Sequence, residues 1–240
     1  TQGVSSAASD VYKRQVLINN DVEVSKNWLV PMFNSMEQNN KIGSCQPKIL
    51  SYENRISFEY AGASGGYIDF LGYPYCRGRI FDTIELDKGQ YDSPMEIFWS
   101  SGACMMIRNK LFKKLGGFDE SFYAHMEEID LCWRIKRLGL KNFCFPKSKV
   151  YHLGGGTLNY NNPKKTFLNF RNNLVMVAKN ASLMSLIIKL PMRLFLDFIA
   201  SFYLLIKNKS YYLFISYPEN LSWILNINEV IDKSKQNLMI

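Results

Sequence analysis

The sequence has few cysteines and histidines for its length of 240 residues. Its five cysteines are Cys45, Cys76, Cys104, Cys132 and Cys144, and it has two histidines. No two cysteines form a C-x-x-C pair, and neither histidine stands at zinc-finger spacing from a cysteine pair, so we expect no zinc module. An odd number of widely spaced cysteines favours reduced thiols in a cytosolic protein.

Motifs that read DNA or RNA and low-complexity segments are also absent. With 47% hydrophobic, 14% aromatic and 21% charged residues, the chain is not disordered in composition and is long enough for one domain with an appendage. From Lys164 to the C-terminus it carries ten Lys or Arg against four Asp or Glu, whereas the preceding residues carry nineteen against seventeen. A basic charge concentrated in an apolar, aromatic tail predicts an anionic membrane surface as partner, and no nucleic acid.

The first fifteen residues lack the features of a native N-terminus. They contain no initiator methionine and neither the basic start nor the apolar segment of a signal peptide. Residues 10–15 resemble the translated end of a transposon used in sequencing adapters. We therefore set residues 1–15 aside as a non-native segment, and expect the native sequence to begin near Val16, inside a strand.

Apolar spacing in the rest of the chain predicts alternating strands and helices. Strands are predicted over residues 16–18, 42–50 and 142–151. Helices are predicted over residues 28–36, 110–115 and 126–138. Pro146 favours an edge or irregular position for its strand, and residues 51–94, rich in Gly, Tyr and Asp, are expected to form an excursion with short strands. This alternation is typical of an α/β domain, which we place at residues 16–165.

Residues 166–240 form a predicted helical tail. Residues 187–206 approach the length of a membrane span, but Lys189, Arg193 and Asp197 interrupt them at four-residue spacing and so share one helical stripe. Pro191 favours a helix that starts there. One polar stripe on an apolar helix is typical of a helix lying at the membrane interface, while a core helix and a true span are the alternatives.

Polar residues follow the first predicted strand directly, as Asn19-Asn20-Asp21. In α/β folds, ligand-binding groups stand at the carboxyl ends of strands. One carboxylate with neighbouring amides suits a hard divalent cation already held by phosphate oxygens. An ordinary solvated turn has the same composition and is the alternative.

Three carboxylates crowd into Glu127-Glu128-Ile129-Asp130 at the start of a predicted helix. The helix dipole stabilises acidic residues there, which is a sufficient structural reason for them. Repulsion between like charges also raises one pKa toward that of a general base, which is the functional alternative.

A histidine follows the last predicted strand and precedes three glycines, in Val150-Tyr151-His152-Leu153-Gly154-Gly155-Gly156. Glycines let a ligand approach the backbone closely, so His152 is a candidate ligand-binding residue as well as an ordinary structural histidine.

Five motifs in order carry a resemblance to a known family. They are N-N-D, W-S-S-G-A, G-G-F-D-E-x-F, E-E-I-D-L-C-W-R and V-Y-H-x-G-G-G. Their order resembles the family-2 inverting glycosyltransferases of the GT-A fold, in particular the rhamnosyltransferase-like members that build bacterial cell-surface polysaccharides. The match extends from about Val16 to Asn180 and includes the segment F-L-N-F-R-N-N at 167–173. The family's nucleotide-binding strands precede N-N-D and are missing here, so the resemblance implies an N-terminally truncated fragment that is inactive by itself.

The resemblance also implies roles for individual residues. Asp21, at the family's D-x-D motif, and His152 are implied to bind Mn²⁺ or Mg²⁺ on the donor diphosphate. Glu128, at the second position of the family's E-D pair, is implied to be the catalytic base. Substrate binding is implied for Asn20, Trp99, Ser101, Gly102, Ala103 and Glu127.

The implied reaction moves a sugar from a nucleotide-diphospho-sugar to a hydroxyl of a glycan or lipid-linked acceptor, with inversion. The implied location is the cytoplasm, peripherally at the inner face of the cytoplasmic membrane. An inactive glycan-binding protein and a membrane-anchored structural protein are the alternatives.

Overall fold

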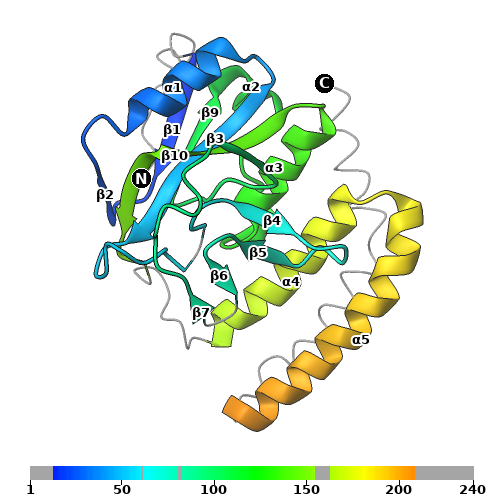
Figure 1. Ribbon diagram of the computed structural model, residues 1–240. Helices are drawn as coiled ribbons and strands as arrows, with labels where there is room; N and C mark the ends of the chain where they lie inside the picture. Colours follow the sequence, from blue (N-terminus) through cyan, green and yellow to red (C-terminus); the bar gives the residue numbers. More distant parts are fainter. Residues whose placement is uncertain (1–12, 61, 81–82, 155–162, 209–240) are drawn as a thin grey trace.

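The computed structural model describes residues 13–60, 62–80, 83–154 and 163–208, which form a mixed α/β domain with helices at the C-terminal end (Figure 1). The main sheet contains β1 (Arg14–Ile18), β2 (Val22–Val24), β3 (Ile42–Ser51), β8 (Met95–Ile97), β9 (Cys104–Arg108) and β10 (Lys141–His152). Its order is β1-β9-β3-β10-β2, and β8 also pairs with β10. β3 and β10 are parallel, and the other pairs are antiparallel.

Five α-helices and a short second sheet complete the described chain. The helices are α1 (Leu29–Gln38), α2 (Asn109–Lys114), α3 (Glu127–Arg137), α4 (Pro163–Asn180) and α5 (Leu183–Asn208), with a 3₁₀ turn at Glu120–Phe122. The second sheet is formed by β4 (Gly66–Ile68), β5 (Pro74–Cys76), β6 (Arg79–Ile80) and β7 (Thr83–Ile84).

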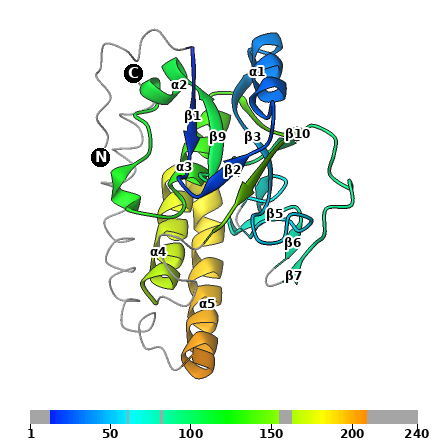
Figure 2. The ribbon, with the colours of Figure 1, turned by 90° about the vertical axis from the view of Figure 1, so that its left-hand side faces the viewer.

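The main sheet is covered on both faces, with α1 on one side and α3 and α4 on the other (Figure 2). Alternation along β9 shows how the sequence produces this layering. Met106 packs with Met32 and Met36 of α1, whereas Met105 and Ile107 pack in the larger core that α3 and α4 share. Because successive side chains of a strand point to opposite faces, one buried apolar strand serves both layers.

Two boundaries differ from the sequence-based expectations. β1 begins at Arg14, so the strand includes two residues of the segment that was set aside, and both pair with β9. The expected domain boundary at residue 165 falls inside α4, whose Val175, Met176 and Val177 belong to the larger core.

β10 lies between β3 and β2, so the expectation of an edge strand was wrong. The expectation of an irregular strand was right, because the pairing register with β3 shifts between Phe145 and Lys149, on either side of Pro146. A bulge at this point accommodates a residue that cannot donate a ladder hydrogen bond.

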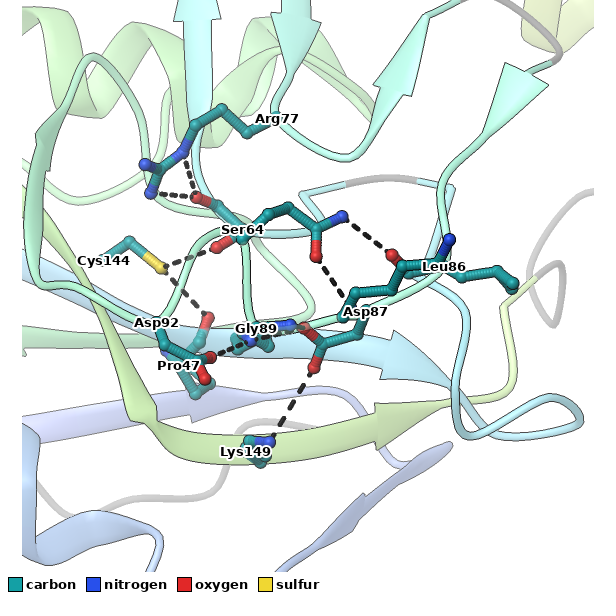
Figure 3. A network of polar contacts seen from close by, with 12 residues as sticks. Pro47, Ser64, Arg77, Leu86, Asp87, Gly89, Asp92, Cys144 and Lys149 are labelled. Atoms are coloured by element: carbon teal, nitrogen blue, oxygen red, sulfur yellow. Dashed lines mark hydrogen bonds and ion pairs between the residues drawn. The ribbon is translucent and has the colours of Figure 1, made fainter.

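The excursion between β3 and β8 is fixed to the main sheet by buried polar contacts. The ammonium group of Lys48, on β3, pairs with Asp87 at 2.8 Å and with Asp92. Figure 3 shows neighbouring contacts, in which Arg77 donates to the Ser64 carbonyl and Lys149 lies 3.8 Å from Asp87. These contacts place the excursion beside the ends of β3 and β10.

The polar stripe on α5 faces the protein and not the outside, which overturns the expected orientation. Arg193 and Asp197 are only 1% and 2% exposed. Arg193 stacks over the Tyr73 ring at 3.6 Å and donates to Asn173, and the Tyr73 hydroxyl donates to Asp197 at 2.6 Å. Burial of the stripe turns the apolar side of the helix outward.

α5 begins at Leu183, so Pro191 lies inside the helix and does not start it as expected. None of the helices in the described residues is long and apolar enough to cross a membrane. The part of the predicted helical tail beyond Asn208 lies outside the described residues.

All five cysteines are free and buried, in agreement with the expected reduced thiols. Burial raises the pKa of the Cys132 thiol to about 12 and that of Cys144 to about 11.

Candidate active site

The site forms at one edge of the main sheet. β1, β3 and β10 run in the same direction and end there, at Ile18, Ser51 and His152, while β9 starts there at Cys104. The turn after β1 is held by the Asn19 N–H, which donates to the carbonyl of Ala103 at 3.0 Å. The fold therefore brings the turn at 19–21 next to Ala103 and next to the end of β10.

Asp21 and His152 face each other at this edge. His152 Nε2 lies 3.2 Å from Asp21 Oδ1, and the Leu153 N–H donates to the Asp21 carbonyl at 3.1 Å. The other ring nitrogen, Nδ1, lies 3.3 Å from Glu59 Oε1. Burial lowers the pKa of His152, but the carboxylates of Glu59 and Asp21 outweigh it and leave this pKa raised.

Glu59 was not identified from the sequence. Its carboxylate is buried in the excursion, and its N–H donates to the Ile49 carbonyl of β3 at 3.1 Å. No local motif marks it, because its partner His152 lies far along the chain. The only sequence feature that could have marked Glu59 is its position beside an apolar residue, Phe58, in a segment expected to contain short strands.

The residues present fit a hard divalent cation. Asp21 and His152 offer one carboxylate oxygen and one imidazole nitrogen, and such ions in nucleotide sites keep few protein ligands because phosphate oxygens and water supply the rest. A carboxylate on the far nitrogen of a metal-binding histidine, as Glu59 stands to His152, is the common way to orient the ring. The described residues contain no group of three or more His, Cys, Asp or Glu arranged around one metal position.

The segment 99–103 supports the site mainly through its backbone. Trp99 is 4% exposed, its ring lies against Gly66, and its indole N–H donates to the Tyr67 carbonyl at 2.9 Å. Ala103 is 6% exposed. Both side chains support the fold at this edge, and their expected contact with a substrate stays a prediction.

Ser101 and Gly102 complete this segment. The Ser101 N–H donates to Gln46 Oε1 at 2.8 Å, and the Ser101 hydroxyl accepts from the Ala103 N–H at 3.2 Å. A methyl group added at Gly102 would stand 3.8 Å from three carbons of the Glu128 side chain. Gly102 therefore borders Glu128 directly and leaves open the space that a side chain would fill. Asn20 is exposed in the turn after β1, and its expected contact with the donor stays a prediction.

Glu127 and Glu128 form the first turn of α3. One carboxylate oxygen of each is buried and has no hydrogen-bond partner among the described residues. Burial, followed by repulsion from Glu127, raises the pKa of Glu128 to about 8, against an opposing effect of backbone N–H groups of the first turn. Burial also raises the pKa of Glu127. A raised pKa makes the ionised Glu128 carboxylate a stronger base, which is the property that a general base needs.

The loop before α3 has an unusual backbone. Tyr123, His125 and Met126 all have positive φ, at 62°, 70° and 75°, although none is glycine. Side chains rarely adopt this region, and each such residue costs about 1–3 kcal/mol unless its surroundings hold it there. Such strain beside a buried carboxylate with a raised pKa is typical of a functional site.

Comparisons with known proteins agree with the resemblance seen in the motifs. A family model described as "Glycosyltransferase like family 2" matches residues 58–194. The chain is 28% identical over 145 residues to the O-antigen biosynthesis protein RfbC of Myxococcus xanthus, covering 57% of this chain and 10% of that protein. It is 35% identical over 88 residues to the N-acetylglucosaminyl-diphospho-decaprenol L-rhamnosyltransferase of Mycobacterium tuberculosis, covering 37% of this chain and 28% of that protein.

Two further similarities complete the comparison. The chain is 22% identical over 178 residues to the low-salt glycan biosynthesis hexosyltransferase Agl10 of Haloferax volcanii, covering 72% of this chain and 53% of that protein. A crystal structure of GalNAc-T7 with UDP, GalNAc and Mn²⁺ matches with a TM-score of 0.49 and 15% identity, over 72% of this chain and 33% of that one. The chain thus spans 10% and 28% of the length of the first two relatives. Because the family model covers more than half of the sequence, the chain belongs to the glycosyltransferase-like family 2.

Proposed function

We propose that the protein transfers a sugar from a nucleotide-diphospho-sugar to a hydroxyl of a glycan or lipid-linked acceptor, with inversion, in cell-surface polysaccharide synthesis. The observation that carries this proposal is Glu128, a carboxylate with a raised pKa and an unpartnered oxygen, which borders Gly102. Family membership supplies the reaction class.

The proposed chemistry needs one proton acceptor. Glu128 takes the proton of the acceptor hydroxyl, and the oxygen attacks the anomeric carbon of the donor sugar. The new carbon–oxygen bond forms on the face opposite the old one, and the nucleoside diphosphate leaves with the electrons of the broken bond. Attack from the opposite face inverts the anomeric centre.

Asp21 and His152 would hold Mn²⁺ or Mg²⁺, with Glu59 orienting the His152 ring. When bound, such an ion neutralises the charge that builds up on a leaving diphosphate. Asp21 is only partly buried and lies in the turn after β1. A nucleotide-sugar bound at this edge of the sheet would therefore be within reach of its carboxylate.

The names of the relatives support the acceptor class. One relative is named for a rhamnosyl transfer to N-acetylglucosaminyl-diphospho-decaprenol, a sugar on a lipid carrier, and another for O-antigen biosynthesis. We propose the same broad class of lipid-linked or glycan acceptor for this protein.

The test compares Asp21→Ala with Glu23→Ala in protein expressed from the complete gene. Glu23 is an exposed carboxylate nearby, on β2, whose partner is Arg55. Asp21→Ala should abolish metal-dependent transfer across a panel of nucleotide-sugars and lipid-linked acceptors, and should weaken Mn²⁺ binding in calorimetry. Glu23→Ala should retain both. Equal activity with and without a chelator would contradict the metal site, and donor binding without any turnover would favour an inactive glycan-binding protein.

We further propose that the outer face of α5 lies against an anionic bilayer, which would hold the protein at the inner face of the cytoplasmic membrane. Large apolar side chains fill this face, with exposures between 38% and 73%. They are Leu183, Met184, Ile187, Ile188, Met192, Phe195, Leu196, Phe198, Ile199, Phe202, Tyr203 and Ile206. An apolar patch of this size on a helix suits insertion into the headgroup region.

Charge supports a lipid occupant for this surface. Seven Lys or Arg and a single Asp, Asp197, lie between residues 163 and 208. Two of the seven do not face lipid, because Arg193 is buried against Asp197 and Lys179 is paired with Asp119 and Asp130. Basic residues near an apolar helix face favour anionic lipid, at about 1 kcal/mol for each residue close to the surface. A membrane-bound enzyme would also meet a lipid-linked acceptor where that acceptor is held.

Flotation with phosphatidylglycerol-containing vesicles tests the membrane proposal. The double variant Phe195→Glu, Phe202→Glu should lose binding, whereas Ile56→Glu, Ile80→Glu should keep it, because the second pair is equally exposed but lies far from α5 in sequence. Binding should weaken in high salt and on neutral vesicles. Binding that appears only after truncation at Asn208 would mean that residues 209–240 cover this face, and a dimer broken by the α5 variant would point to a second copy.

A further inference from the structure

The strained loop before α3 is held by one side chain from α4. Asn172 is fully buried, and its Nδ2 donates to the carbonyls of Phe122 at 2.8 Å, Ala124 at 2.7 Å and His125 at 2.9 Å. The amide has two hydrogens for three carbonyls, so one hydrogen is shared. These carbonyls lie in the same stretch as the residues of positive φ, Tyr123, His125 and Met126, and His125 belongs to both sets.

A neighbouring guanidinium fixes the direction of this amide. Arg171 donates through Nη1 to Asn172 Oδ1 at 2.8 Å and to the Ser121 carbonyl at 3.1 Å. With Oδ1 engaged, Nδ2 must point toward the loop. The next residue, Asn173, contacts the end of the same loop, because its Nδ2 lies 3.9 Å from the Met126 sulfur. The same Nδ2 donates to the Gly72 carbonyl at 2.9 Å.

We propose that Asn172 is a positioning residue for the catalytic base: by tying down three carbonyls of the loop at 122–125, it fixes the first turn of α3 and holds Glu128 against Gly102. The inference rests on the proposed function of Glu128. It gives a role to the segment F-L-N-F-R-N-N, which the assignment of metal ligands and base left without one.

The loop leads directly into the base. Met126 is the N-cap residue of α3 and has no side-chain cap of its own, so no capping side chain fixes the start of the helix. If the carbonyls of Ala124 and His125 were released, the strained residues could relax and the first turn could open to water. Small displacements of a reacting group can cost up to about 100-fold in rate.

The matched control is Asn180, on the same helix. It is also a buried asparagine whose Nδ2 donates to two acceptors, Asp130 Oδ1 at 2.8 Å and the Met176 carbonyl at 3.0 Å. Neither of these two acceptors belongs to the loop before α3, so Asn180→Ala reports the cost of losing a buried amide without disturbing that loop.

The experiment combines transfer assays with two measurements that need no activity. Asn172→Ala should lower kcat about 10- to 100-fold with the KM for the donor unchanged, whereas Asn180→Ala should stay within about twofold. Amide hydrogen exchange over residues 122–128 should accelerate in Asn172→Ala alone. The ¹³C titration of the Glu128 carboxyl, identified by its loss in Glu128→Gln, should move from near 8 toward an ordinary glutamate value, because the group gains water.

The titratable groups that act on Glu128 are Glu127 beside it and the Cys132 thiol one turn further along α3, and both remain in every variant. If Asn172→Ala is too unstable to purify, Arg171→Met keeps the amide but removes its orienting donor, and should shift exchange and titration in the same direction by less. The proposal is overturned if Asn172→Ala matches Asn180→Ala in exchange and titration. If every variant and the wild type lack transfer, the proposed function fails, and exchange and titration still decide whether Asn172 positions Glu128.

Discussion

Glu128 and Asp130 stand two residues apart on α3, yet their surroundings are opposite. Asp130 is fully buried, and its carboxylate accepts from Arg134 Nε and Asn180 Nδ2, both at 2.8 Å, with the Lys179 ammonium 3.0 Å away. Glu128 has a buried oxygen with no partner among the described residues. The comparison separates a carboxylate that stabilises the fold from one that is kept reactive.

Helical geometry produces this difference. Side chains two residues apart point about 200° apart around a helix, so Asp130 faces α4 while Glu128 faces Gly102. The partner of Asp130, Arg134, also donates to the carbonyls of Leu115 at 2.6 Å and Gly117 at 2.9 Å. A buried carboxylate paired with cations is stable in its charged form, whereas Glu128, which has backbone N–H groups but no cation beside it among the causes of its shift, has a raised pKa.

The largest expected effect is on catalysis. Glu128→Gln keeps the shape of the side chain but removes the proton acceptor, so kcat should fall about 10²- to 10⁴-fold, the usual contribution of a general base. Donor affinity should stay nearly unchanged, because the proposed donor contacts lie at Asp21 and His152. Steady-state kinetics with protein expressed from the complete gene measures both. Glu127→Gln is the control and should cost less in kcat and more in acceptor KM. A greater loss of kcat in Glu127→Gln would mean that the neighbouring carboxylate is the base.

The next effect is on stability and should appear at Asp130 alone. Asp130→Asn leaves Arg134 and Lys179 without their shared buried carboxylate, and breaking a buried ion pair in this way costs about 3–5 kcal/mol. Urea unfolding measures the change, with Glu128→Gln as the comparison that should show no such loss. If both variants unfold at the same urea concentration, the two carboxylates do not differ in the way proposed.

The smallest effect is the dependence of stability on pH. Because the folded-state pKa of Glu128 is raised to about 8, the folded chain binds more protons than the unfolded chain between pH about 4.5 and 8. Stability should therefore fall as pH rises through this window, and Glu128→Gln should escape that part of the fall. The melting temperatures of the two proteins should agree near pH 4.5 and separate toward pH 8. Each kcal/mol of difference in the free energy of unfolding should shift the melting temperature by about 2–4 °C. A constant difference across the window would contradict the raised pKa.

Individual helices and strands could be predicted from the sequence because the apolar spacing that marks each of them lies within the element itself. The spacing over 126–138 predicted α3 closely, and the apolar run at 42–50 predicted β3. The resemblance placed Asp21 and His152 at one metal ion, which requires the two side chains to lie close together, as they do. Each of these predictions needed only periodicity or a resemblance.

Contacts between side chains that lie far apart in the sequence could not be predicted. The polar stripe on α5 was interpreted as the mark of a helix lying at the membrane interface, but Tyr73 and Asn173 bury it, and no residue near Arg193 in the sequence indicates these contacts. The same holds for Glu59 beside His152 and for Asn172 beneath the loop before α3. Two adjacent amides at 172 and 173, directly before the apolar run at 174–178, were an available signal that a polar contact is buried there.

The burial of every native thiol makes the chain a ready background for spectroscopy. Burial raises the pKa of Cys76 to about 11 and of Cys104 to about 12, so at neutral pH the native thiols are neutral, covered and slow toward maleimides. A cysteine introduced at an exposed position such as Phe195 would then be labelled selectively, with no native residue replaced. A polarity-sensitive dye attached there would report directly whether the outer face of α5 lies in water or in lipid.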